Sequence, residues 1–395
     1  MNIKLGVIFG GVSVEHEVSI ISAVQAMKAI DTEKYDVIPI YITKDREWYT
    51  GAVLKDMDTY TDMDLLKRYS SNVDLVRKKG KFYLQTKGLI KRCVTDIDII
   101  LPICHGTNME DGTLQGYLQT IGIPYCESDV APSSVAQDKV TQKLVFESRE
   151  LPVSPYIWFY DVDYNNNPEE TIKKCAALGY PVVVKPATLG SSVGINFAKN
   201  ETELKNALEE AITYDKKILV EKAVTNLSEV NISVLGDYKY QETSEVEEVT
   251  TIHHLLTFED KYIGNNKSKP SKGMASLGRR IPANISEKLK KEVEHVATEA
   301  FKAVGLAGVC RIDFLIDTKE NKVYINEINS IPGSMAFYLW EPKGKKYREL
   351  LDEVIKIGVK NYQSNNKKIH SFESNILAGY KNGAKGAKGF KGSKF

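Results

Sequence analysis

Short apolar segments alternate with helical segments in the first third of the chain, and this alternation constrains the fold more than any other feature. Residues 3–11, "IKLGVIFGG", end in two glycines and precede a helical pattern over 13–30. Residues 35–43 and 97–106 are further apolar segments, and the helical pattern "EDGTLQGYLQTIG" follows the second of them. Strands that alternate with helices predict an open parallel α/β sheet, in which ligands gather at the carboxyl ends of the strands.

The pattern changes twice farther along the chain. A second unit begins near Asp138 with a helical segment, the apolar strand "YPVVVKPA" and the glycine-rich "LGSSVGINFA". From about Glu229 the chain is rich in strands, and the residues after about 365 are polar, with many Gly and Lys. We therefore expect an N-terminal α/β domain that binds substrate, two further subdomains and a disordered tail, with the bounds 1–138, 139–228, 229–365 and 366–395.

The segment "RIDFLIDTKENKVYINEIN" (311–329) has the pattern of a hairpin of two apolar strands with an unusual set of polar residues. Residues two apart on a strand share a face, so Arg311 projects with Asp313, and Glu327 projects with Asn329. One reading is a solvated outer face, which is how most charges on strands behave. The other is a site for a hard cation, because Asp313, Glu327 and Asn329 offer only oxygen ligands, which suit Mg²⁺.

Two other apolar strands end in charged residues. Lys185 closes "VVVK", and Glu221 with Lys222 closes "ILVEK", although buried charges need a partner of opposite sign. The loop 189–195 offers backbone amides that suit phosphate oxygens, although its composition alone is more typical of a plain hairpin turn. No P-loop sequence occurs in the chain. Lysines, an amide-rich loop, oxygen ligands and Arg311 together nevertheless indicate an ATP site.

Charge and cysteine usage exclude several classes of protein. The chain has 53 basic and 52 acidic residues, but five lysines and no acidic residue lie in 379–395, so the remainder carries a net charge of about −4. Nucleic-acid binding is not expected, because it needs a concentrated basic face. Five widely spaced cysteines without a C-x-x-C pair indicate a reducing compartment, and no signal peptide or membrane span is expected. These features predict a cytoplasmic protein without a membrane partner.

The order of motifs along the chain resembles the ATP-grasp superfamily and, within it, the D-alanine–D-alanine ligases. The motifs are "GGVSVEHEVS", "HGTNMEDGTLQG", "DK", "VVKPATLGSSVG", "LVEK", "RIDF" and "NEINSIPG". The resemblance extends from the first strand to about residue 362. It implies an N-terminal open parallel α/β sheet followed by two ATP-grasp subdomains, the second of which carries the metal site.

The resemblance also implies a reaction. ATP would convert the carboxylate of one D-alanine to an acyl phosphate, and the amine of a second D-alanine would attack it. The product would be D-alanyl-D-alanine for peptidoglycan synthesis. Cations would neutralise charge, and a lid would exclude the water that hydrolyses the intermediate.

Individual roles at the nucleotide follow from the same resemblance. The residues implied for ATP are Lys139, Lys185 and Ser192 at the phosphates, Glu221, Lys222 and Val224 at the adenine, and Glu229 at the ribose. The residues implied for two Mg²⁺ or Mn²⁺ ions are Asp313, Glu327 and Asn329. Arg311 would stabilise the transferring phosphoryl group and the acyl phosphate.

Other residues are implied for the amino acids. Glu15 would hold the ammonium of the first D-alanine and His105 its carboxylate end, while Ser191 and Tyr262 would position Glu15 and the lid. Lys261 would lie close to the second substrate. Without the resemblance, Glu15 is more typical of a polar residue in the first turn of a helix. His105 is then as typical of a hydrogen-bonded turn as of a ligand contact. The family further implies a homodimer.

The sequence departs from the family near the second substrate. The segment after Gly333 is several residues shorter than usual, so the assignment of Ser334 as the serine that meets the second carboxylate stays open. Lys261 and the pair Arg279-Arg280 offer replacement positive charge for that carboxylate. We therefore expect D-alanine as the donor, and a weak or shifted Michaelis constant for the acceptor.

Two alternatives to D-alanine ligation remain at this point. One is a related ATP-grasp ligase that joins a D-amino acid to D-serine, a D-hydroxy acid or another amine. The other is a nucleotide-binding regulator without catalysis, which is disfavoured because Arg311 and all three metal residues are present.

Overall fold

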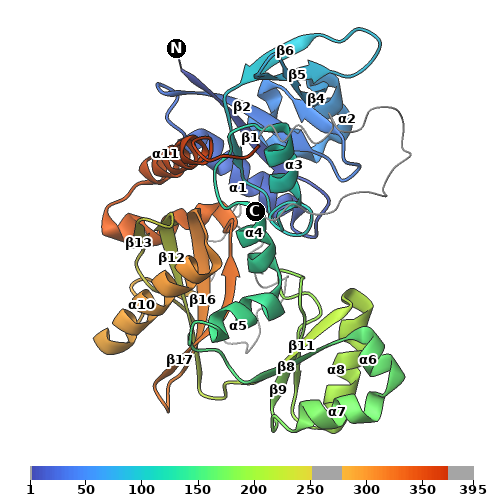
Figure 1. The fold of residues 1–395 in the computed structure, drawn as a ribbon, viewed down its shortest axis with the longest axis vertical. Coiled ribbons are helices and arrows are strands. Elements are labelled where there is room, and N and C mark those ends of the chain that lie inside the picture. Colours follow the sequence, from blue (N-terminus) through green and yellow to red (C-terminus); the bar gives the residue numbers. More distant parts are fainter. Residues whose placement is uncertain (1, 251–277, 372–395) are drawn as a thin grey trace, which may run out of the picture.

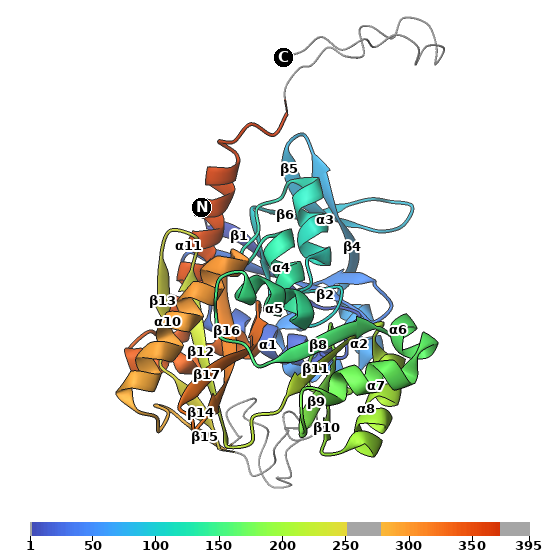
Figure 2. The same ribbon diagram turned by 60° about the horizontal axis from the view of Figure 1, so that its bottom comes forward.

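The computed structural model describes residues 2–250 and 278–371, and its strands form three sheets (Figure 1). The N-terminal sheet lies at the top of the view, the central sheet at the bottom, and the C-terminal sheet between them. Turned by 60°, the C-terminal sheet with its helices and the central sheet with its helices stand on opposite sides (Figure 2). Our expectations for Lys261, Tyr262 and the tail after residue 371 lie outside the described residues.

The N-terminal sheet has the strand order β6-β5-β4-β3-β2-β1-β7. Its strands are β1 (Ile3–Gly10), β2 (Tyr35–Ile42), β3 (Trp48–Thr50), β4 (Ser71–Lys78), β5 (Lys81–Thr86), β6 (Cys93–Ile97) and β7 (Ile99–Pro102). The helical segments of this region are α1 (His16–Ala29), η1 (Ala52–Lys55), η2 (Met57–Thr61), α2 (Met63–Tyr69) and α3 (Thr113–Ile121).

The predicted α/β class is confirmed, but this sheet is mixed rather than parallel throughout. Strand β1 pairs in parallel with β2 and β7, whereas β3 to β6 pair in antiparallel fashion. The physical reason is the length of the connections. The two residues Lys79 and Gly80 join β4 to β5, and so short a turn permits only antiparallel pairing, because parallel neighbours need a crossover.

The central sheet is antiparallel, with the order β10-β9-β11-β8. Its strands are β8 (Tyr156–Tyr160), β9 (Val182–Pro186), β10 (Asn196–Ala198) and β11 (Lys217–Lys222), and its helices are α6 (Asp161–Asn166), α7 (Pro168–Ala176) and α8 (Glu201–Tyr214). Helix α8 shows why these residues fold as they do. The Asn200 side chain caps its first turn, and its buried residues recur at helical spacing, so one apolar face packs on the sheet.

The C-terminal sheet has the order β15-β14-β12-β16-β17, with β13 beside β12. Its strands are β12 (Leu227–Gly236), β13 (Gln241–Thr243), β14 (Glu247–Val249), β15 (Arg279–Arg280), β16 (Gly308–Asp317) and β17 (Lys322–Asn329). The helical segments around it are α4 (Val130–Gln137), α5 (Lys139–Glu147), α10 (Glu287–Val304), η4 (Gly333–Leu339), η5 (Glu341–Lys343) and α11 (Tyr347–Asn365). The antiparallel pairing of β16 with β17 confirms the predicted hairpin.

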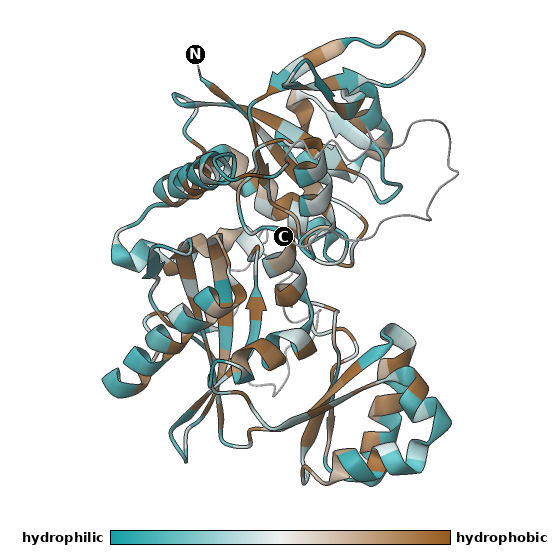
Figure 3. Ribbon diagram, in the orientation of Figure 1, coloured by the Kyte–Doolittle hydropathy of each residue, from teal (hydrophilic) through white to brown (hydrophobic). Residues whose placement is uncertain are grey.

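Apolar side chains of the sheets and of the inner helix faces form separate cores, and brown segments mark them in Figure 3. One core joins the N-terminal sheet to α11, η4 and the ends of β12 and β16. A second lies between the C-terminal sheet and α10 and includes Phe146 of α5, although we predicted that 139–147 belongs to the central subdomain. The exact domain bounds stay a prediction. None of the described helices is long and apolar enough to span a bilayer.

Candidate active site

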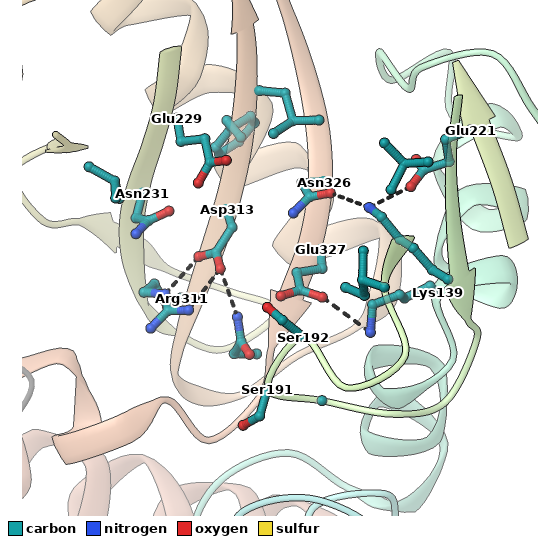
Figure 4. A pocket seen from close by; sticks show the side chains of 18 of the residues that line it. Lys139, Ser191, Ser192, Glu221, Glu229, Asn231, Arg311, Asp313, Asn326 and Glu327 are labelled. Carbon is teal, nitrogen blue, oxygen red and sulfur yellow. Dashed lines mark hydrogen bonds and ion pairs between the residues drawn. The ribbon is translucent and has the colours of Figure 1, made fainter. Parts of the chain in front are cut away.

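A cavity of about 490 Å³ is lined by residues of the central and C-terminal sheets, of the start of α1 and of the loops next to them (Figure 4). Of the predicted site residues that the structure describes, all but Ser334 line it. They are Glu15, His105, Lys139, Lys185, Ser191, Ser192, Glu221, Lys222, Val224, Glu229, Arg311, Asp313, Glu327 and Asn329. Residues that are far apart in the sequence thus converge on one place, as the motif order predicted.

The hairpin β16–β17 supplies the anionic wall of the cavity. Asp313 lies opposite Glu327 in the strand register, and Arg311 lies opposite Asn329. The Arg311 guanidinium donates two hydrogen bonds to the Asp313 carboxylate, at 2.6 and 2.7 Å, and the Asn329 amide donates to the same carboxylate at 3.3 Å. The polar residues of this hairpin therefore face the cavity, and the reading as a solvated outer face is excluded for them.

The donor set on this hairpin fits Mg²⁺. Asp313, Glu327 and Asn329 offer two carboxylates and an amide oxygen, all of them hard ligands. Within 2–250 and 278–371, no three His, Cys, Asp or Glu residues gather as a metal cluster. A cation held by this donor set would complete its shell with water and phosphate oxygens. Mg²⁺ commonly binds in that way. Arg311 and Lys139 are the cations that balance the two carboxylates in this structure.

A buried charge cluster ties the central sheet to α5. The Glu221 carboxylate lies 2.5 Å from the ammonium of Lys185 and 2.5 Å from that of Lys143, and it accepts a hydrogen bond from Ser154. Burial alone would raise the pKa of Glu221, but the two ammonium groups outweigh burial and hold this pKa below its ordinary range. Burial lowers the pKa of Lys143, whereas Glu221 raises that of Lys185 in spite of burial. Lys185 is therefore held in its charged form at the cavity.

Lys185 also reaches across to the C-terminal sheet. Its ammonium donates a hydrogen bond of 2.9 Å to the side-chain oxygen of Asn326 on β17. Figure 4 shows Asn326 on the hairpin and Glu221 on the opposite wall, with the dashed contacts of the lysine between them. One carboxylate oxygen of Glu221 contacts Lys143 and Ser154 and the other contacts Lys185, so this side chain orients Lys185 in the present structure.

Two further lysines have contrasting positions. Asp138 caps α5 through the backbone amides of Val140 and Thr141, which starts the helix at Lys139 and places this lysine at the cavity. The Lys139 ammonium donates to the Leu189 carbonyl at 2.8 Å and lies 3.2 Å from Glu327. Lys222, by contrast, turns away and donates to the Gly179 and Tyr180 carbonyls.

The glycine-rich loop after β9 lines the cavity next to the start of α1. Ser191 and Ser192 both have a positive φ, of 56° and 61°, a conformation that L-residues adopt at a cost of about 1 kcal/mol or more. The Ser191 hydroxyl donates a hydrogen bond to the Glu15 carboxylate, which links the central and N-terminal sheets. A Cβ on Gly190 would lie 2.9 Å from a carboxylate oxygen of Glu15, so a larger residue there would displace the end of that side chain.

His105 is buried and fully hydrogen-bonded. Its Nδ1 lies 2.8 Å from the Ile331 carbonyl and therefore carries the proton, and its Nε2 accepts from the Ser22 hydroxyl at 3.0 Å. Burial lowers the pKa of His105, so the imidazole is neutral at neutral pH. The predicted contact of His105 with a substrate carboxylate stays a prediction, since both nitrogens are already engaged.

Ser334 lies behind the cavity wall. It begins a run of three residues with positive φ, Ser334 to Ala336, and this left-handed turn directs its side chain toward α1. The Ser334 amide donates to Ser22, and its hydroxyl donates to Gln25 at 2.6 Å. No described contact supports the predicted role of Ser334 at the second substrate.

Several polar residues of the cavity region did not stand out in the sequence. They are Glu110, Lys143, Asn231, Glu247, Asn326 and Tyr338. A signal existed for Lys143, which lies four residues after Lys139 on a helix and so shares its face, and for Glu110, which lies inside the motif "HGTNMEDGTLQG". Burial, and next the Glu15 carboxylate, raises the pKa of Glu110 to about 8, so this side chain is mostly a neutral acid at pH 7.

The chain is similar to two family models that together cover most of its length. The model described as "D-ala D-ala ligase N-terminus" matches residues 4–128, and that described as "D-ala D-ala ligase C-terminus" matches residues 145–356. A D-alanine–D-alanine ligase of Thermosipho melanesiensis is 39% identical over 376 residues, which are 95% of this chain and 98% of the relative.

Solved structures agree with this similarity. The D-alanine–D-alanine ligase of Coxiella burnetii superposes with a TM-score of 0.78 at 27% identity and covers 93% of this chain and 96% of its own. The VanG D-Ala:D-Ser ligase of Enterococcus faecalis superposes with a TM-score of 0.75 at 28% identity and covers 91% and 100%. The ATP-grasp fold that the motifs implied is thus confirmed.

Proposed function

The chain belongs to the D-alanine–D-alanine ligase family, and from this premise we propose how its cavity residues divide the work of joining two D-alanines with ATP. The protein is a carbon–nitrogen ligase that depends on ATP. The observation that carries this conclusion is identity over nearly the whole length to a D-alanine–D-alanine ligase. The relatives' names favour D-alanine as the acceptor over the D-serine alternative.

The reaction has two steps. A carboxylate oxygen of the first D-alanine attacks the γ-phosphorus of ATP, and the bond from that phosphorus to the oxygen of ADP breaks. The amine of the second D-alanine then attacks the carbonyl carbon of the acyl phosphate and loses a proton, and phosphate leaves as the C–N bond forms. Both steps gather negative charge, so cations and oriented dipoles are the main contribution of the protein.

Two lysines and one arginine bind the negative charge of the phosphates and of the transferring phosphoryl group. Lys139 and Lys185 contact the phosphates, with the loop 190–194 and Ser192 above them, and Arg311 stabilises the transferring phosphoryl group. All these residues line the same cavity, which supports these roles. Glu221 assists by orienting Lys185, because their charges lie 2.5 Å apart in a buried site.

The adenine of ATP and the donor D-alanine occupy opposite ends of the cavity. The strand end 221–224 holds the adenine through its backbone, and Glu229 holds the ribose. Glu15 binds the ammonium of the first D-alanine, and Ser191 positions Glu15 through their hydrogen bond. His105 completes the pocket of the donor near Glu15, where it is neutral.

Asp313, Glu327 and Asn329 would hold two Mg²⁺ or Mn²⁺ ions, which when bound supply positive charge to the phosphates.

We further propose that the protein acts in the cytoplasm as a homodimer and supplies dipeptide for peptidoglycan. All five cysteines are free, which is consistent with a reducing compartment. A solution mass of about twice 44.3 kDa, measured by light scattering, would support the dimer.

Replacement of Glu327 tests the assignment of the anionic wall. We expect Glu327→Gln to lower the turnover of ATP with D-alanine by about 100-fold or more, because one carboxylate that holds charge against the phosphates is lost. The measurement is phosphate release, with the dipeptide identified by mass. The matched control is Glu320→Gln, since Glu320 lies in the exposed turn of the same hairpin. A folded Glu327→Gln protein with the turnover of the control would contradict the assignment.

A further inference from the structure

The two arginines of β15 point in opposite directions. Successive side chains of a strand alternate between its faces, so Arg279 and Arg280 cannot both face the cavity. Arg279 lines the cavity, and its side chain is 10% exposed. Arg280 is 54% exposed and lies 3.3 Å from Glu248 on the outer side. Only one of the two extra positive charges near the second substrate is therefore available inside the cavity.

The Arg279 guanidinium is held by two groups of the C-terminal sheet region. It lies 3.5 Å from the Glu247 carboxylate, which is almost fully buried and accepts a hydrogen bond of 3.0 Å from Asn231. It also stacks over the ring of Tyr338, with 4.7 Å between the guanidinium carbon and the ring centroid. Contacts on two sides fix the orientation of this planar group, which can bind a carboxylate through two parallel hydrogen bonds.

The hydroxyl of Tyr338, whose ring supports Arg279, does not line the cavity. It is buried and has no hydrogen-bond partner among the residues that the structure describes. The charged groups that act on it are Glu247, Arg279, Arg311 and Asp313, all of which line the cavity. Burial raises the pKa of Tyr338, so its hydroxyl keeps its proton.

The shortened segment after Gly333 explains the arrangement. Its left-handed turn directs Ser334 to Gln25, away from the cavity, and it brings the ring of Tyr338 against Arg279. The cavity wall thus has no hydroxyl from Ser334 but has the guanidinium of Arg279, which the Tyr338 ring supports from behind.

We propose that Arg279, supported by the Tyr338 ring, binds the carboxylate of the acceptor amino acid and so selects acceptors that carry a carboxylate. Glu247 is a positioning residue for Arg279. The inference rests on the proposed function, because it names the group that recognises the second substrate of the same reaction. Arg280 has no part in it.

A competition between two acceptors tests the proposal. D-alanine and D-alaninamide are supplied together with Mg²⁺ and ATP; the amide has an amine but no carboxylate, so it can act only as acceptor. The two products, the dipeptide and its amide, are quantified by mass spectrometry. We expect Arg279→Met to lower the ratio of dipeptide to dipeptide amide about 30-fold, because a charge-assisted hydrogen-bond pair is lost for one acceptor only. Arg280→Met leaves this ratio unchanged, because its side chain is exposed and lies at Glu248.

The outcomes that overturn the proposal differ from those that overturn the reaction. An unchanged product ratio in Arg279→Met, or an equal fall in Arg280→Met, would exclude the assignment of Arg279. If the single variant does not fold because Glu247 is left unpaired, the double variant Arg279→Met/Glu247→Gln removes both charges and carries the same expected ratio. A wild-type protein that forms neither product would overturn the proposed function itself.

Discussion

At the scale of single residues, the site depends on a carboxylate placed between two lysines. The sequence indicated Lys185 and Glu221 as charges at the ends of apolar strands, and the structure adds Lys143 from α5. Both lysine side chains are buried, so water does not screen their positive charges. The stability of this part of the chain therefore depends on Glu221 more than on any exposed ion pair.

We expect Glu221→Gln to reduce the free energy of unfolding by about 3 kcal/mol, because two buried ammonium groups lose their common counter-charge. Urea unfolding at pH 7 measures the change. The control is Glu170→Gln on α7, where the exposed pair with Lys174 is screened by water and no measurable change is expected. Equal stability of the two variants would show that Lys143 deprotonates in the folded protein without further loss.

The sequence predicted most of the cavity because its motifs carry charge in unusual places. Arg311, Asp313, Glu327 and Asn329 stand out on strands that are otherwise apolar, and strand alternation alone placed them on one face. Glu247 and Tyr338 could not be predicted in this way, since a glutamate in a polar segment and one tyrosine among 21 look ordinary. Their role depends on a tertiary approach of β14, β15 and η4 that no local pattern encodes.

At the scale of elements, the carboxylate of Asp352 adds a polar link between helix α11 and the N-terminal sheet, beside their shared apolar core. Asp352 accepts a hydrogen bond of 2.7 Å from the Tyr35 hydroxyl and lies 3.0 Å from Lys34, at the start of β2. Lys356, one helical turn on, lies 2.8 Å from the same group. Burial alone would raise the pKa of Asp352, but these partners outweigh burial and lower it to about 2.

We expect Asp352→Asn to destabilise the protein by about 1–2 kcal/mol at pH 7, a value discounted because both lysines are half exposed. The folded-state pKa lies below the ordinary value, so the contribution of Asp352 is present above about pH 4 and is lost as the pH falls toward 2. The stability difference between wild type and variant, measured by urea unfolding, should therefore shrink over this range.

The matched control is Glu353→Gln, one residue on, where the carboxylate is 42% exposed. It should change stability little at any pH. A difference between wild type and Asp352→Asn that stays constant from pH 7 to pH 2 would contradict the assigned titration.

The elements themselves were predictable to different degrees. The hairpin β16–β17 and the alternation in the first third follow from periodicity, and both are present. The antiparallel half of the N-terminal sheet was missed, because β3 has only three residues and β4 and β5 mix charged with apolar residues. Short strands of this kind acquire their pairing from neighbouring strands rather than from their own pattern.

At the scale of the whole molecule, the three sheets are not equally bound to one another. The N-terminal and C-terminal sheets share one large core, to which α11 and Trp340 contribute. The central sheet has a core of its own. Beyond the small apolar cluster of Val140, Ala187 and Leu219, its described links to the rest are mainly polar, such as the Glu221 cluster and the contact of Lys185 with Asn326. The central sheet is thus the part that can open most independently.

Hydrogen exchange can measure this difference in local stability. Without nucleotide, we expect amides of β9 and β11 to exchange through an opening about 2 kcal/mol or more less costly than that of β1 and β16. We expect a non-hydrolysable ATP analogue with Mg²⁺ to contact the central and C-terminal sheets at once and so to protect β9 and β11 most. At 100 times its dissociation constant it adds about 2.7 kcal/mol, enough to close that gap.

In Lys185→Met the gap should persist, because the lysine that spans the two sheets is lost. Equal exchange of all three sheets without nucleotide would show instead that the polar links alone make the molecule one cooperative unit.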